Sequence, residues 1–126
     1  MSTVDRSMAD VTIYHNQNCS TSRYAMDVIA DDGAEAEIVQ YLKTPLDRAE
    51  LVELMGKLED PPADLVRKDP YFKELGLSAD DYTTVDEVAD LLVEHPRLMQ
   101  RPVLVKGDRA IIGRPKDRVP AFLAEA

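Results

Sequence analysis

The chain has 126 residues and a hydrophobic content of 44%, which suits one domain with a single modest core. No stretch approaches the roughly 18 apolar residues of a membrane span, and the N-terminus has no apolar signal-peptide core, so we expect a cytoplasmic protein without a membrane partner. The net charge of −9 argues against general binding to nucleic acid. Residues 97–126 are nevertheless basic, with seven Lys or Arg against three Asp or Glu, which leaves room for a pocket that takes a small anion.

The N-terminal part of the chain predicts a loose end followed by a folded unit. Residues 1–10 show no hydrophobic period and are expected to form a flexible N-terminal extension, with one domain over residues 11–126. The first three elements of this domain form a strand–helix–strand unit. They are a strand over 11–15, a helix over 20–31 and a strand over 37–41.

A helical region follows. Thr44 is expected to cap its first helix, with Pro45 at the first helical position and Asp47 at the third. Leucine and methionine residues continue this helix at spacings of three and four until Pro61. Three further helices are expected, over residues 63–68, 71–75 and 84–94, the last with a capped start.

The C-terminal part predicts a hairpin. Two apolar runs, at 103–105 and 110–112, flank a turn centred on Gly107, and a closing helix is expected over 119–124. This order of elements predicts an α/β thioredoxin-like (glutaredoxin-like) fold, in which helices flank a four-stranded mixed sheet and a helical insertion separates the second and third strands. In such a fold the end of the first strand lies beside the entry to the hairpin, which brings Arg101 and Pro102 near Cys19.

Cys19 stands between the first strand and the first helix, and this placement predicts a reactive thiol. The free backbone N–H groups of the helix favour a thiolate and lower the thiol pKa. A helix N-terminus contributes about 2 kcal/mol at most, so full activation needs a cation as well. His15 and Arg23 are the candidates close in sequence, and the hydroxyls of residues 20–22 are candidate donors to the sulfur. The alternative is a buried, inert cysteine, although Asn, Gln, Ser and Thr neighbours are unusual for a core thiol.

The cysteine count limits the chemistry further. One cysteine cannot form an internal disulfide or a cysteine-rich metal site, and the two histidines lack a metal-ligand spacing, so we expect no metal and no bound cofactor.

Three arginines occur beside apolar or turn residues: Arg67, Arg101 and Arg114. A guanidinium presents a planar fork that binds a tetrahedral oxyanion through two parallel hydrogen bonds. Several forks around one thiolate would hold such a substrate for attack, whereas each arginine taken alone is equally compatible with an ordinary surface position. Pro102 either simply begins a strand or forms a cis turn beside the thiol.

Several segments, in this order and spacing, resemble the glutaredoxin-coupled ArsC arsenate reductases. They are Ile13-Tyr14-His15-Asn16-x-x-Cys19-x-Thr21-Ser22-Arg23, Tyr41-Leu42, Leu65-Val66-Arg67-Lys68, Leu75-Gly76-Leu77, His95-Pro96, Gln100-Arg101-Pro102 and Gly113-Arg114-Pro115. The resemblance covers roughly residues 11–123 and implies a thioredoxin-like fold with a helical insertion, in agreement with the pattern of elements.

The resemblance also implies roles for individual residues. Cys19 is the nucleophile that attacks arsenate and forms a cysteinyl thioarsenate. The three arginines named above bind the oxyanion, His15 and Ser22 tune the thiol, and Pro102 is the cis-proline of the family. The reductant is implied to be glutathione with glutaredoxin, although another low-molecular-weight thiol with its redoxin satisfies the same chemistry. Nothing in the sequence demands more than a monomer.

Two alternatives remain open at this stage. The chain is compatible with a monothiol reductase of mixed disulfides that lacks arsenate activity, and with an Spx-like regulator that binds RNA polymerase. A mixed-disulfide reductase has little need of three arginine forks. Spx-type regulators typically use a Cys-x-x-Cys switch, and Ser22 stands where the second cysteine would be.

Overall fold

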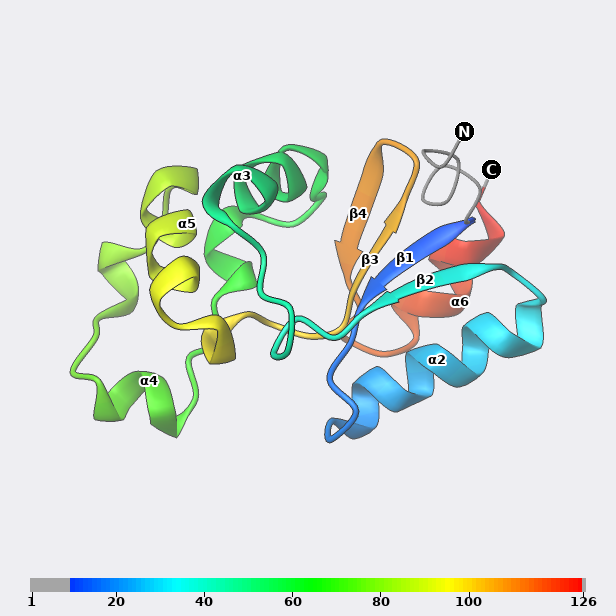
Figure 1. Cartoon of the computed structure of the whole chain (residues 1–126), viewed down its shortest axis with the longest axis horizontal. Coiled ribbons are helices and arrows are strands. Elements are labelled where there is room, and N and C mark those ends of the chain that lie inside the picture. Colours follow the sequence, from blue (N-terminus) through cyan, green and yellow to red (C-terminus); the bar gives the residue numbers. More distant parts are fainter. Residues whose placement is uncertain (1–9, 126) are drawn as a thin grey trace.

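The computed structural model describes residues 10–125. The predicted N-terminal extension therefore lies, apart from Asp10, outside the described residues. Figure 1 shows the sheet with helices α2 and α6 on one side of the molecule and a group of helices, α3 to α5, on the other. Within residues 10–125 no helix is both long and apolar enough to cross a membrane.

The sheet has four strands in the order β2-β1-β3-β4. The strands are β1 (Val11–Tyr14), β2 (Ala36–Val39), β3 (Val103–Lys106) and β4 (Arg109–Ile112). Strand β1 pairs in parallel with β2 and antiparallel with β3, and its central residue Ile13 lies opposite Ile38 on one side and Leu104 on the other. The mixed four-stranded sheet predicted from the sequence is confirmed.

Helices α2 (Ser20–Asp32) and α6 (Arg118–Ala124) pack together against the sheet. Ile29 of α2 and Phe122 of α6 share one buried cluster with Ile13 and Leu104 of the central strands. Gly33 ends α2 in the left-handed conformation (φ 76°), where a glycine carries no steric penalty. This cluster fixes the start of α2 relative to the end of β1, which is where Cys19 lies.

The helical insertion lies between β2 and β3. It contains α3 (Arg48–Lys57), α4 (Pro70–Glu74) and α5 (Val85–Glu94), with short 3-10 turns at Pro62–Leu65, Ala79–Asp81 and Pro96–Leu98. A second buried cluster joins these helices to the sheet, and on the surface Arg48 of α3 bridges Asp86 and Asp90 of α5. The capped start expected for the last of these helices is confirmed, because Thr84 and Glu87 form a capping box.

The first helix of the insertion differs from the prediction at both ends. Asp47, not Thr44, is its N-cap, because Asp47 and Glu50 form a capping box that satisfies two backbone N–H groups at once. The helix ends at Lys57, before Pro61, because Leu58 forms a parallel bridge with Ala110 and the Glu59 N–H donates to the Ala110 carbonyl. The backbone after Lys57 therefore pairs with the edge strand β4 and does not continue the helix.

The prediction of a helix over residues 63–68 is also wrong in part. Only a 3-10 turn forms, and the chain then becomes extended because Val66 forms an antiparallel bridge with Met99. The Arg67 N–H donates to the Leu98 carbonyl at 2.6 Å in the same pairing. This short pairing holds the segment that carries Arg67 beside the segment that leads to Arg101.

Candidate active site

Cys19 occupies the N-cap position of α2, at the end of the loop that follows β1. Its N–H donates to the Asn16 carbonyl at 3.0 Å, and its carbonyl accepts the Arg23 N–H at 2.9 Å, which starts the helix. The loop is closed further by the Asn18 N–H, which donates to Asn16 Oδ1 at 2.9 Å. The residue is 7% exposed, so its side chain is largely buried at the helix start.

The pKa of Cys19 lies below that of a free thiol. Burial raises the pKa, but several opposing contacts outweigh it: the backbone N–H of Ser22, the hydrogen bond and charge of the Arg101 side chain, and the backbone N–H of Thr21. The lowered pKa predicted from the sequence, and the expected closeness of Arg101 to the thiol, are both confirmed. The thiolate is the nucleophilic form, so this environment favours reaction at sulfur.

The cations that face the sulfur come from the hairpin region. Arg114 Nη2 donates to Cys19 Sγ at 3.3 Å, and Arg114 Nε donates to the Arg101 carbonyl at 2.7 Å. The Nε of Arg101 is buried and, among the described residues, has no hydrogen-bond partner. A buried guanidinium N–H without an acceptor costs free energy, and an anionic ligand beside Cys19 would remove that cost.

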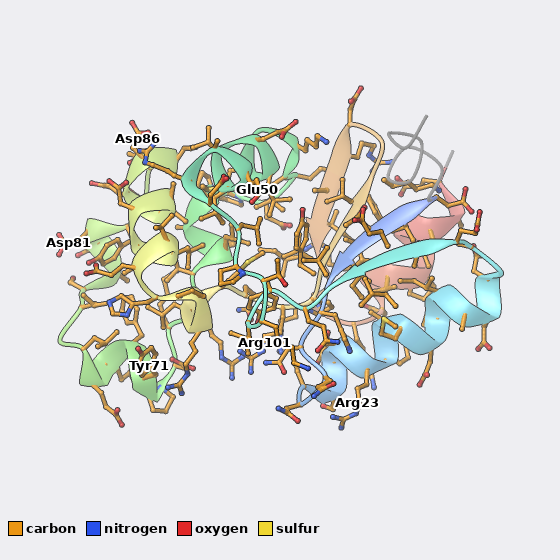
Figure 2. All side chains as sticks on the ribbon, in the orientation of Figure 1. Arg23, Glu50, Tyr71, Asp81, Asp86 and Arg101 are labelled. Atoms are coloured by element: carbon orange, nitrogen blue, oxygen red, sulfur yellow. The ribbon has the colours of Figure 1, made fainter. Side chains whose placement is uncertain are left out.

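The two candidates close in sequence, His15 and Arg23, do not supply the cation at the sulfur. The pKa of His15 is lowered, first by burial and then by the Arg23 charge, so its ring is neutral near pH 7. Arg23 Nη1 donates to the Gln17 carbonyl at 2.9 Å. Figure 2 shows Arg23 at the start of α2 and Arg101 between that helix and the helical insertion.

The side chain of Ser22 forms hydrogen bonds within the cysteine loop and does not contact the sulfur. Its hydroxyl is fully buried, accepts the Asn16 N–H at 3.1 Å and lies 2.6 Å from His15 Nδ1. In this arrangement the Nδ1 of a neutral His15 ring can accept a hydrogen bond from the Ser22 hydroxyl. The serine therefore ties the end of β1, the cysteine loop and the first turn of α2 together, while its backbone N–H serves the thiol.

The lowered pKa of His15 predicts a pH-dependent stability. Because the unfolded chain protonates His15 more readily than the folded chain does, the free energy of unfolding should fall as the pH drops through the ordinary histidine pKa of about 6.5. Urea unfolding at pH 7.5 and 5.5 measures this fall. The variant His15→Asn should show a smaller fall than the wild type, and equal falls in the two proteins would rule out a contribution from His15.

Arg67 is held in a different contact. Its Nε donates to Asp69 Oδ2 at 3.0 Å, and Asp69 also caps α4 by accepting the Phe72 N–H at 3.1 Å. Burial raises the pKa of Asp69, but these hydrogen bonds and the Arg67 charge lower it overall. The structure thus brings Arg114 into contact with both Cys19 and the Arg101 carbonyl, and it pairs Arg67 with Asp69.

Pro102 forms a cis peptide bond with Arg101, and the Arg114–Pro115 bond is also cis, which the sequence did not lead us to expect. The Pro102 carbonyl accepts the Gly113 N–H at 2.8 Å. A Cβ on Gly113 would lie 2.9 Å from Pro102 Cγ, too close for any side chain there without a shift. Gly113 therefore allows the segments that precede and follow the hairpin, with Arg101 and Arg114, to lie side by side.

Sequence reasoning also missed Arg118 and Asp60. Arg118 Nη1 donates to the Ile112 carbonyl at 2.9 Å and to the Arg114 carbonyl at 3.3 Å, and pairs with Asp60 at 2.9 Å. Asp60 in turn accepts the Ile112 N–H at 3.0 Å. The pair fixes the backbone that carries Arg114. The sequence offered one signal for this role: Arg118 lies four residues after Arg114, at the start of the predicted closing helix.

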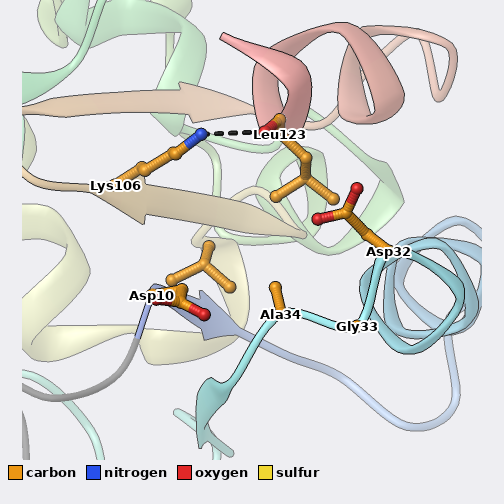
Figure 3. A pocket seen from close by; sticks show the side chains of 7 residues that line it. Asp10, Asp32, Gly33, Ala34, Lys106 and Leu123 are labelled. Atoms are coloured by element: carbon orange, nitrogen blue, oxygen red, sulfur yellow. Dashed lines mark hydrogen bonds between the residues drawn. The ribbon is translucent and has the colours of Figure 1, made fainter. Parts of the chain in front are cut away.

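The surface has two hollows of similar volume, one far from Cys19 and one beside Arg114. One of about 330 Å³ is lined by Asp10, Asp32, Lys106 and Leu123, at the end of β1 opposite to Cys19, and Lys106 Nζ donates to the Leu123 carbonyl there at 2.8 Å (Figure 3). The other, of about 320 Å³, is lined by Arg114 and therefore adjoins the thiol site. Among residues 10–125 no group of three or more His, Cys, Asp or Glu could hold a metal ion.

Comparisons with known proteins show which family the chain belongs to. The chain is 39% identical over 121 residues to the arsenate reductase of Escherichia coli strain K12, covering 94% of this chain and 84% of the relative. It is 40% identical over 111 residues to the uncharacterized protein YfgD of the same organism, covering 86% and 92% of the two chains. Among solved structures, an arsenate reductase from Vibrio cholerae matches with a TM-score of 0.78 and 32% identity, covering 88% of this chain and 95% of that one. The model of the ArsC family matches residues 14–122, and the chain therefore belongs to the ArsC family.

Proposed function

We propose that this protein is an arsenate reductase, an oxidoreductase that reduces arsenate to arsenite with Cys19 as its nucleophile. One observation carries the proposal: a thiol of lowered pKa lies 3.3 Å from the Arg114 guanidinium and beside Arg101, whose buried Nε has no partner among the described residues. A thiolate surrounded by guanidinium donors suits a tetrahedral oxyanion. A reductase of mixed disulfides has less need of several guanidinium donors, because its substrate is not an oxyanion.

The reaction has three steps. The Cys19 thiolate attacks arsenic and forms a sulfur–arsenic bond, while an oxygen of arsenate leaves as water after protonation. An external thiol then attacks Cys19 Sγ, the sulfur–arsenic bond breaks, and arsenite leaves with the bonding electron pair. A second thiol finally reduces the mixed disulfide on Cys19. Two thiols thus supply the two electrons that arsenic gains.

The arginines stabilise charge during the first step. Arg101 and Arg114 neutralise the oxyanion, which otherwise repels the thiolate, and they stabilise the negative charge of the transition state. Arg67 completes the oxyanion site in this proposal. Asp69 engages its Nε, and among the described residues its two terminal nitrogens have no partner. Pro102 and Ser22 contribute by fixing the segments that carry Arg101 and Cys19.

The reductant has to come from outside, because the chain has one cysteine. The hollow beside Arg114 is the proposed approach for a small thiol. Lys68 and Arg114 supply positive charge there, Arg118 is paired with Asp60, and Asp64 supplies a further carboxylate. Glutathione carries two carboxylates and one ammonium group and complements this lining. A glutaredoxin-type redoxin then reduces the mixed disulfide on a monomeric protein. We place the reaction in the cytoplasm, where reducing conditions keep Cys19 as a thiol.

A coupled assay tests this function and its reductant together. Arsenate should stimulate oxidation of glutathione in the presence of glutaredoxin, and 2-mercaptoethanol at the same thiolate concentration should support turnover at least several-fold more slowly, because it lacks the charges that match the hollow. Equal rates with both thiols would remove the proposed thiol site. Absence of arsenate-dependent oxidation with any thiol would remove the proposed function itself.

A further inference from the structure

The outer edge of β4 is covered by the chain that leaves α3. Strand β4 is the last strand of the sheet, so its outer N–H and C=O groups face no further strand of residues 10–125. The Glu59 N–H donates to the Ala110 carbonyl there at 2.9 Å. At Ile112 two side chains take the place of a strand, because its N–H donates to Asp60 Oδ2 at 3.0 Å and its carbonyl accepts from Arg118 Nη1 at 2.9 Å. Ile112 is buried, so its backbone groups depend on these two contacts.

Asp60 and Arg118 also bind each other. Asp60 Oδ1 accepts from Arg118 Nη1 at 2.9 Å, and the two side chains are only 16% and 31% exposed. The same nitrogen donates to the Arg114 carbonyl at 3.3 Å. One ion pair, partly shielded from solvent, therefore contacts the backbone at Ile112 and at Arg114, on both sides of Gly113.

The contacts of Arg118 do not serve its own helix. Arg118 is the first residue of α6, and the N-cap Asp117 makes no side-chain capping bond. The N-terminus of a helix carries partial positive charge, so a guanidinium is electrostatically unfavourable there. What the arginine stabilises instead is the segment that carries Arg114, together with Asp60 from the helical insertion.

The segment held in this way ends at the sulfur. Arg114 Nη2 donates to Cys19 Sγ at 3.3 Å, and Arg114 Nε donates to the Arg101 carbonyl at 2.7 Å. A guanidinium fork binds an anion through two parallel hydrogen bonds only in the correct orientation. A backbone shift at Arg114 would therefore disturb its contacts with the thiol and with the neighbouring arginine together.

We propose that Asp60 and Arg118 are positioning residues of the active site, whose ion pair holds the backbone of residues 112–114 so that Arg114 faces Cys19. Since Asp60 belongs to the chain that leaves α3, the helical insertion thereby helps to set the reactivity of the thiol. The part of this inference that concerns arsenate rests on the proposed function. The part that concerns the thiol does not, because Arg114 contacts the sulfur whether or not arsenate is the substrate.

The first test is Arg118→Met, which keeps a long apolar side chain and removes the donors. Alkylation of Cys19 by iodoacetamide, followed against pH, should shift to higher pH because Arg114 is held less firmly at the sulfur. The kcat/KM for arsenate should fall about three- to tenfold, the range of one hydrogen bond. Urea unfolding verifies that the variant is folded.

The variant Asp60→Asn separates positioning from the effect of charge alone. Removal of a carboxylate should by itself lower the pKa of a nearby thiol, whereas a loosened Arg114 should raise the pKa of Cys19. The two explanations therefore predict shifts of opposite sign. Positioning predicts that the alkylation profile of Asp60→Asn moves to higher pH, as in Arg118→Met. No shift, or a shift to lower pH, in folded Asp60→Asn would overturn the proposal.

Arg109→Met is the matched control. Arg109 pairs with Glu59, the residue before Asp60, but it lies at the opposite end of β4 from Ile112. The variant removes an ion pair between the same two segments and leaves the backbone contacts of Arg114 in place. Its alkylation profile and its kcat/KM should stay within about twofold of the wild type. Equal effects in Arg109→Met and Arg118→Met would indicate a general loosening of β4 and would refute the positioning role.

A double-variant cycle identifies the residue through which the pair acts. If the pair acts through Arg114, Arg118→Met should cause little further loss of kcat/KM, and little further alkylation shift, in an Arg114→Ala background. Full additivity of the two substitutions would overturn the proposal. A wild type that lacks arsenate turnover would refute the proposed function, while the alkylation profiles would still decide the role of Asp60 and Arg118.

Discussion

The variant Cys19→Ser should lose arsenate-dependent turnover down to the uncatalysed rate, a drop on the order of 10⁴-fold or more. A serine hydroxyl is not ionised near neutral pH, so the donors that stabilise the thiolate have no anion to act on. Serine also cannot form the mixed disulfide through which an external thiol regenerates the enzyme. The measurement is arsenate-dependent oxidation of glutathione in the coupled assay.

The serine variant should keep the native fold. Cys19 is the N-cap residue of α2, and a serine hydroxyl at this position can accept hydrogen bonds from the same backbone N–H groups that lower the thiol pKa. Serine is a favourable N-cap residue, so urea unfolding should show no loss of stability. Direct reduction of arsenate by glutathione sets the background that is subtracted. Turnover above this background in folded Cys19→Ser would exclude Cys19 as the nucleophile.

Arg114→Ala should lower kcat/KM for arsenate about 100- to 1000-fold, the range seen when one oxyanion donor is removed. The guanidinium has two functions here. Its Nη2 contacts Cys19 Sγ at 3.3 Å, and its Nε holds the Arg101 carbonyl at 2.7 Å, so the substitution removes a charge at the sulfur and loosens the neighbouring arginine. Initial rates over a range of arsenate concentrations measure kcat and KM separately.

Two further variants define the origin of this effect. Arg114→Lys keeps the charge and loses the planar fork, so it should recover only part of the activity. Arg97→Ala is the control for a lost positive charge, because Arg97 lies on the helical insertion with its guanidinium 4.0 Å from the Tyr71 ring. Its kcat/KM should stay within about twofold of the wild type. Full recovery in Arg114→Lys would show that charge alone is sufficient.

Local patterns in the sequence were sufficient to predict the elements that carry the thiol. The apolar strand before residue 16 and the helix that begins at Ser20 both follow from hydrophobic period and capping chemistry. Cys19 was placed correctly because both flanking elements have strong local signals. The capped start of the helix at Thr84 was predicted for the same reason.

Contacts between distant segments were harder to predict. The segment that carries Arg67 is extended because Val66 pairs with Met99, a partner 33 residues away, and its helical pattern gave no sign of this. The cation at the sulfur was predicted in part. His15 and Arg23 were the candidates close in sequence, while the order of strands placed Arg101 near Cys19. The structure supplies the cations from Arg101 and Arg114, which the hairpin register and Gly113 bring together.

The most direct test of the account is to measure arsenite itself. The wild-type protein is incubated with arsenate, glutathione and glutaredoxin, and the arsenic species are separated and quantified together with the disulfide formed. The account predicts one arsenite for each pair of thiols oxidised, with no arsenite above background from Cys19→Ser. Thiol oxidation by the wild type without arsenite, or arsenite formation that survives in Cys19→Ser, would contradict it.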